Sequence, residues 1–191
     1  PVVSREAVFD FELIGPSKVK ADSLDVSVAV LPQKIVSHFV GILEVAGIRP
    51  LSLELEPQAV ARALVPRGDR RTTLVINFGG VSTGLAIVGR NVVQYSSTLN
   101  IGGNAFSSAI KKTMAAEGKE MGGDIGKFSS MLGTLSVLRD EVNRLLTYWK
   151  EHRMLADGVA NANDDKIESV ILCGRDANIN GFREYISANV N

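Results

Sequence analysis

Two glycine pairs within the stretch Thr72–Asn104 are the residues of this sequence best suited to bind an anion. Gly79-Gly80 follows a short apolar segment that ends at Asn77, and Gly102-Gly103 stands where a helical pattern begins. Glycine lets the backbone approach a ligand closely, and the bare N–H groups of such turns attract anions. The spacing therefore makes a phosphate group the first candidate ligand.

Three expected strands position these glycines. Leu74–Ile76, Gly84–Val88 and Val92–Leu99 are rich in β-branched and apolar residues, and Gly89-Arg90-Asn91 supplies a tight turn between the last two. The pattern predicts a three-stranded meander, followed by a helix that Asn104 caps. Because the first glycine pair joins a strand to a strand, it is neither a Walker A loop nor a dinucleotide fingerprint, both of which place the phosphate on a helix N-terminus.

Five further elements are expected before this stretch. Ala7–Ile14 and Leu24–Val30 alternate between apolar and polar side chains, which is typical of strands with one face in water. Helical spacing between Pro32 and Gly47 predicts a helix with a glycine C-terminal cap. Leu51–Leu55 alternates as a short strand does. Pro57 begins a segment, Pro57–Leu64, whose pattern predicts a short helix.

The C-terminal part is expected to add a loop, a long helix and a buried strand. Residues 118–133 are rich in glycine and lack a clear period, which indicates a loop or a reduced subdomain. Leu135–Trp149 has a continuous helical stripe that predicts the longest helix of the chain, with Asp140 and Arg144 paired on its wet side. Ile167–Cys173 ends in a uniformly apolar run, so we expect it in the centre of a sheet.

Composition excludes several classes of function. Of 191 residues, 21 are basic and 21 are acidic, so no net field draws the chain to nucleic acid or an anionic membrane. A single cysteine, Cys173, excludes an internal disulfide, and two histidines offer little for zinc. No apolar run reaches the roughly 18 residues of a membrane span. We expect a cytoplasmic protein, and a start at Pro1 inside a strand pattern suggests a piece of a longer one.

Asn77–Thr83 resembles the second phosphate loop of the actin-like superfamily of ATPases, in which an acidic residue, a glycine pair and a threonine form a hairpin against the phosphates. Gly102-Gly103 before a helix matches the next element of that superfamily, and Val170–Ala177 resembles its adenosine loop. Two positions depart from the pattern. Asn77 replaces an aspartate that usually binds magnesium through water, and Arg175 replaces the second of two glycines, where a side chain obstructs a close ligand.

Within the superfamily the sequence is similar to the PilM family of type IV pilus assembly proteins, itself similar to the cell-division protein FtsA. The resemblance covers nearly the whole chain. Besides the loops above, it rests on these segments: Leu31-Pro32, Leu53–Pro57, Asn100–Phe106, Glu141–Arg144 and Ile179–Tyr185.

The resemblance implies an α/β fold: an actin-like, ribonuclease H-like mixed sheet with flanking helices, plus part of a small inserted α+β subdomain. Residues 1–48 would form the C-terminal part of that subdomain. Residues 49–70 would be a connecting strand and helix of the first actin-like half, ending in the polar turn Pro66–Arg71, and residues 71–191 the second half. On this interpretation the chain lacks the N-terminal part of the family, including its first phosphate loop.

The resemblance also implies a nucleotide site for ATP with magnesium, and it assigns no catalytic residue. Glu141 would face the base or ribose, although the alternative is a solvated partner of Arg144. The glycines have an alternative too, since they could serve only tight turns. The implied nucleotide-binding residues are Asn77, Gly79, Gly80, Thr83, Gly102, Gly103, Glu141 and Gly174.

The function that the resemblance implies is that of a cytoplasmic adaptor in type IV pilus assembly and twitching motility. Such a protein binds the tail of an inner-membrane partner of the PilN type, links it to the assembly motors and lies at the cytoplasmic face of the inner membrane. Weakened nucleotide binding would set domain closure. Two alternatives remain: an active ATPase or sugar kinase of the superfamily, and a scaffold similar to FtsA or to the type II secretion protein GspL.

Overall fold

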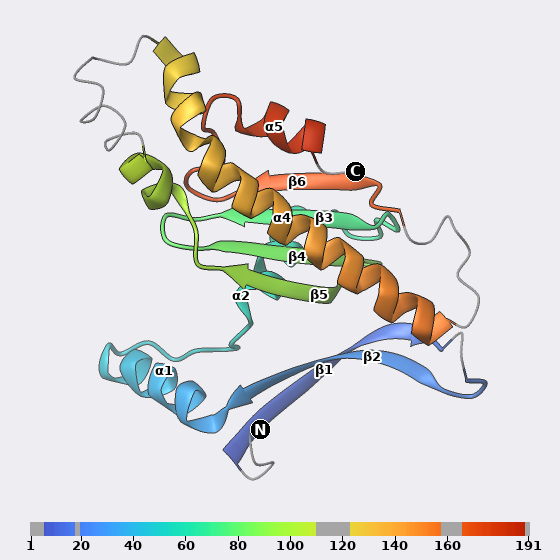
Figure 1. Ribbon diagram of the computed structural model, residues 1–191. Helices are drawn as coiled ribbons and strands as arrows, with labels where there is room; N and C mark the ends of the chain where they lie inside the picture. Colours follow the sequence, from blue (N-terminus) through green and yellow to red (C-terminus); the bar gives the residue numbers. More distant parts are fainter. Residues whose placement is uncertain (1–5, 18–19, 110–122, 158–165, 190–191) are drawn as a thin grey trace.

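The computed structural model describes residues 6–17, 20–109, 123–157 and 166–189 (Figure 1). The strands are β1 (Ala7–Pro16), β2 (Leu24–Pro32), β3 (Thr73–Phe78), β4 (Thr83–Gly89), β5 (Val92–Leu99) and β6 (Ser169–Cys173). The helices are α1 (Gln33–Val45), α2 (Glu56–Leu64), α4 (Gly123–Asp157) and α5 (Phe182–Asn189). Residues 103–109 are also helical.

The central sheet has four strands in the order β5-β4-β3-β6. β3, β4 and β5 pair as the predicted antiparallel meander, and β6 is parallel to β3. The turn between β4 and β5 consists of Arg90 and Asn91, whose φ angles of 54° and 65° are those of a type I′ hairpin turn. The mixed sheet with flanking helices confirms the predicted fold class.

Helices cover both faces of this sheet (Figure 1). Leu74, Leu85 and Ile87 belong to one face and pack in a single buried cluster with Leu138 and Trp149 of α4. The opposite face contributes a smaller cluster, which includes Ala61 and Val65 at the end of α2 and Val75 of β3. The alternation of side chains along each strand therefore places α4 and α2 on opposite sides of the sheet.

Three local predictions are wrong. Leu51–Leu55 does not form a strand; its alternating leucines remain exposed or half-buried. Helix α4 begins at Gly123, so the part of residues 118–133 that the structure describes is helical and not a loop. Adding one turn to an existing helix gains a hydrogen bond per residue, which offsets the unfavourable propensity of its glycines. On α4, Arg144 pairs with Glu141 at 2.7 Å and not with Asp140.

Strand β6 was expected in the centre of a sheet, but among the described strands it lies at the edge. It pairs with β3 on one side only, with Val170 opposite Leu74 and Leu172 opposite Ile76. The uniformly apolar run is explained by helices on both faces of the sheet, because Leu172 and Ile171 contact different core clusters. Val170 is 41% exposed.

A second, two-stranded sheet is formed by β1 and β2, which pair antiparallel with Phe11 opposite Val28. Its apolar side chains were expected to be half-buried, but they are exposed by 42–71% among the described residues, since α1 makes little contact with the pair. We call them the ribbon face. They are Phe9, Phe11, Leu13, Val26, Val28 and Val30.

The ribbon is joined to the central sheet through its other face. The Ser27 hydroxyl of β2 donates a hydrogen bond to the Val93 carbonyl of β5 at 2.8 Å. In the part of the chain that the structure describes, no helix is long and apolar enough to cross a membrane.

Candidate functional site

The glycine loops meet at one end of the central sheet, where β3, β5 and β6 all end (Figure 1). The N–H of Gly103 donates to the Gly79 carbonyl at 3.0 Å, and that of Asn104 donates to the Gly80 carbonyl at 2.8 Å. The turn after β6 joins them, because the Asp176 N–H donates to the Phe78 carbonyl at 3.2 Å. Three segments that are far apart in the sequence therefore form one group of loops.

Glycine is required at these positions by the packing of the loops themselves. A Cβ atom on Gly102 would collide with the backbone of Gly79 and Gly80. Gly174 has a φ of 98° and lies so close to Phe78 that a Cβ would come within 2.5 Å of its carbonyl oxygen. The packing of the loops therefore requires these glycines, whether or not a ligand binds.

The same hydrogen bonds limit what the loops offer to a phosphate. A helix N-terminus binds an anion through its first N–H groups. At the helix of residues 103–109, two of these groups, those of Gly103 and Asn104, already donate to hairpin carbonyls. At the converging glycine loops, which we call the phosphate cradle, part of the donor set for an anion is therefore committed within the protein.

Asn77 lies next to the loops on the side of the sheet that α2 covers. Its amide nitrogen donates to the Glu56 carboxylate at 2.6 Å, and its amide oxygen lies 3.7 Å from the Cys173 thiol. Asn77 and Glu56 line a cavity of about 20 Å³, which has room for roughly one water molecule. Burial, and then the charge of Glu56, raises the pKa of the Cys173 thiol.

Thr83 faces the opposite side of the sheet from Asn77, because it pairs with Phe78, the next residue of β3. Its side chain is fully buried, and its hydroxyl donates to the Ile101 carbonyl at 2.6 Å. That bond ties the start of β4 to the segment that leads into the second glycine pair. In this arrangement the Thr83 hydroxyl is engaged within the protein and holds the loops together.

The side chains of Arg175 and Asp176 lie over two of the glycines. A Cβ on Gly80 would collide with the Arg175 guanidinium, and one on Gly103 would collide with the Asp176 carboxylate. The two side chains pair at 2.9 Å, and Arg175 also donates to the Asn104 amide oxygen at 3.1 Å. The Arg175 side chain therefore lies against the first glycine pair, and its obstruction of a ligand stays a prediction.

The full length of the chain, residues 1–191, matches the family of the type IV pilus assembly protein PilM. The chain belongs to this family. A solved PilM–PilN type IV pilus biogenesis complex is similar to this PilM-family chain with a TM-score of 0.70 and 21% identity, over 98% of the chain and 55% of that one. The chain thus spans about half the length of this relative.

Two further relatives support the actin-like fold of this PilM-family chain. MreB5 of Spiroplasma citri, solved with ADP, superimposes with a TM-score of 0.63 at 17% identity and covers 84% of the chain, which spans 59% of that protein. The cell shape-determining protein MreB of Escherichia coli K12 is 39% identical over 66 residues, or 34% of the chain and 19% of that protein. The predicted actin-like fold class is confirmed.

Glu141 is the one predicted site residue whose polar contacts lead away from the glycine loops. It lies on α4 and is 13% exposed; it accepts hydrogen bonds from Ser97 of β5 at 3.3 Å and from Arg144 at 2.7 Å. The PilM-family chain thus places Glu141 beside β5 and pairs it with Arg144, although its carboxylate is mostly buried and not the solvated group of the alternative.

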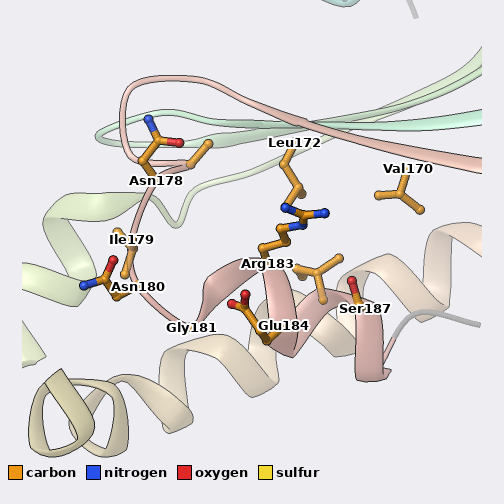
Figure 2. Close-up of a pocket in the computed structure, with 11 residues that line it drawn as sticks. Val170, Leu172, Asn178, Ile179, Asn180, Gly181, Arg183, Glu184 and Ser187 are labelled. Carbon is orange, nitrogen blue, oxygen red and sulfur yellow. The ribbon is translucent and has the colours of Figure 1, made fainter.

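A hollow with a volume of about 850 Å³ lies elsewhere on the described surface, between β6 and α5 (Figure 2). Leu172 of β6 and Arg183 of α5 line the hollow from opposite sides. Asn178 and Asn180, from the loop between these two elements, also line it. None of the predicted nucleotide-binding residues lines it.

Glu56 is the residue near the loops that sequence reasoning did not assign. Its only local signal was the pair Glu56-Pro57 at the start of a helix, which also occurs in helices without a site. Its importance comes from Asn77, which lies 21 positions later in the chain. Within the residues that the structure describes, no group of three or more metal-ligating side chains is found.

Proposed function

We propose that this chain is part of an actin-like adaptor of type IV pilus assembly. It binds the cytoplasmic tail of an inner-membrane partner of the PilN type and links that partner to the assembly motors at the cytoplasmic face of the membrane. The observation that carries the proposal is the family match over residues 1–191. The similarity to a PilM chain solved in complex with PilN supports the identity of the partner.

The ribbon face is the surface that we assign to the tail. Three side chains of β1 and three of β2 form one contiguous apolar patch, and Phe9 and Phe11 are exposed by 71% and 62%. Exposed apolar patches of this kind commonly mark sites of protein association. Aromatic side chains supply most of the free energy at such interfaces, so Phe9 and Phe11 are expected to be its anchors.

Nucleotide binding is the second part of the proposal. ATP would be held where the loops at Gly79, Gly102 and Gly174 converge, at the carboxyl ends of the strands, which is the usual ligand edge of such sheets. Magnesium would be attracted by the Glu56 carboxylate, which the Asn77 amide holds in place. Asn77 carries no charge of its own, and this favours a nucleotide that sets domain closure over rapid turnover.

Calorimetric titration of the full-length protein with a PilN-type tail peptide tests the adaptor role. Phe11→Gln should weaken binding at least about tenfold, which is typical of losing an aromatic anchor. Glu12→Gln places the same residue next to it on the opposite face of β1 and should leave binding unchanged. If Phe11→Gln lowers the melting temperature but not the affinity, the ribbon face is covered within the protein and the tail binds elsewhere.

Thermal melting of the full-length protein with ADP or ATP tests the nucleotide role. A ligand that binds the native state raises the melting temperature in proportion to the logarithm of its concentration. We expect a shift at millimolar nucleotide with magnesium. If the melting temperature does not shift, the protein is a scaffold that binds no nucleotide. If the protein releases phosphate from ATP and Asn77→Ala lowers that rate, an active ATPase is favoured instead.

A further inference from the structure

We propose that Arg175 and Asp176 form a latch that closes the phosphate cradle of this chain, so that a nucleotide phosphate enters only after the Arg175 side chain has moved away. This inference rests on the nucleotide part of the proposed function. It concerns the two residues that follow Gly174, the first of which, Arg175, stands where the resemblance implies the second glycine of a pair.

The latch bridges the loops that meet at the end of the sheet. Arg175 follows β6, lies against Gly80 of the β3–β4 hairpin and donates to the Asn104 side chain at the start of the 103–109 helix at 3.1 Å. Asp176 covers Gly103 of the same helix. Each of the two glycine pairs therefore has one member whose free face is occupied by a side chain of the protein.

The charges of the latch disfavour a polyphosphate while it is closed. The Asp176 carboxylate accepts two hydrogen bonds from the Arg175 guanidinium, so the positive charge that would attract a phosphate is already neutralised. The carboxylate itself repels phosphate oxygens. A closed latch thus offers a phosphate no net positive charge, and the Asp176 carboxylate adds a local repulsion.

The latch is also built to open at small cost. The Arg175 side chain is 65% exposed, whereas Asp176 is 22% exposed and its backbone N–H is fixed to the Phe78 carbonyl. Ion pairs that are exposed on one side are weak because water competes for both partners. Arg175 is therefore the moving part, and Asp176 is the fixed catch.

Equilibrium titration of the full-length protein with a fluorescent ADP analogue tests this. The double variant Arg175→Ala/Asp176→Asn removes the cover and the repulsion together and should bind about fivefold more tightly, the factor that corresponds to an exposed ion pair. Arg175→Ala alone should gain less, because Asp176 is left without its partner. The matched control, Arg71→Ala/Asp69→Asn, removes another close pair in an exposed loop and should leave the affinity unchanged.

The outcomes separate the latch from the nucleotide site. Weaker binding by the double variant would show that Arg175 contacts the phosphate, and unchanged binding would show that nothing needs to open; either result overturns the latch and leaves the site. If the double variant binds the analogue and the wild-type protein does not, the latch is supported, but the proposal that the wild-type protein binds nucleotide fails. If neither protein binds, both proposals fail, and circular dichroism of each variant shows that it is folded.

Discussion

The side-chain amide of Asn77 donates a hydrogen bond to the Glu56 carboxylate across 2.6 Å and so joins strand β3 to the first turn of α2. The pair brings a negative charge next to the glycine loops without placing one on β3. Glu56 also contributes to the raised pKa of the Cys173 thiol, which shows that its charge reaches the carboxyl end of β6.

Asn77→Asp should turn this hydrogen bond into a repulsion between two carboxylates. We expect the variant to lose about 1 kcal/mol of stability at neutral pH, a fall in melting temperature of about 2–4 °C. Millimolar Mg²⁺ should restore most of it, because two carboxylates attract a hard dication. Asn77→Ala is the control, since it loses the bond without gaining charge. An equal magnesium response in both variants would contradict the geometry.

Gly174→Ala should destabilise the protein by at least about 2 kcal/mol, because its φ of 98° is unfavourable for alanine and the new Cβ would lie 2.5 Å from the Phe78 carbonyl oxygen. Gly41→Ala is the matched control. Nothing lies within 4 Å of a Cβ at that position of α1, so alanine should stabilise the helix by about 0.5–1 kcal/mol. Urea unfolding followed by circular dichroism compares the two. A similar loss in both would mean that Gly174 is not specially constrained.

The fold of the central sheet was predictable because its signals are local. A few consecutive residues are enough to predict strand β4 and the turn Arg90-Asn91. The apolar stripe Leu135–Trp149 predicts the helix that covers them. The sequence-based predictions were wrong where a segment had the pattern of a strand but lacked the neighbouring strand that the pattern implied. Among the described residues, the leucines of 51–55 alternate as in a strand but pair with no other strand, and β6 is apolar although it lies at the edge of the sheet.

For the candidate site, the positions of the glycine loops could be predicted from the sequence, but the side-chain contacts around them could not. Glycine pairs at Gly79 and Gly102 indicate loops at the ends of strands, and the loops do converge. The contacts that decide the chemistry join residues far apart in the chain, Asn77 with Glu56 and Arg175 with Gly80. No spacing rule links such residues, because their distance depends on how α2 and the turn after β6 pack on the sheet.

Asp69 should titrate at unusually low pH. Hydrogen bonds from the side chain and the backbone N–H of Arg71 lower the pKa of its carboxyl from the usual 3.8 to about 2. A depressed pKa stabilises the folded state above pH 4, and this contribution is lost as the pH falls from about 4 through 2. Carbon-detected NMR of the carboxyl group measures it. Arg71→Ala should return the pKa toward its usual value, and a wild-type value near 3.8 would show that the pair does not persist in solution.

Cys173 should react slowly with alkylating reagents while the protein is folded. Burial, followed by the nearby charge of Glu56, raises the pKa of its thiol, and the thiolate is the reactive form. At pH 8 we expect modification with iodoacetamide to be at least about fivefold slower than in denaturant. Glu56→Gln should recover part of that difference, because it removes the charge and leaves the burial. Glu54→Gln removes a carboxylate that is close in sequence but paired with Arg62, and it should change nothing. If Cys173 reacts equally fast in the folded and unfolded protein, the carboxyl end of β6 is open to solvent, and the loop arrangement around Gly174 is not the one that the protein adopts in solution.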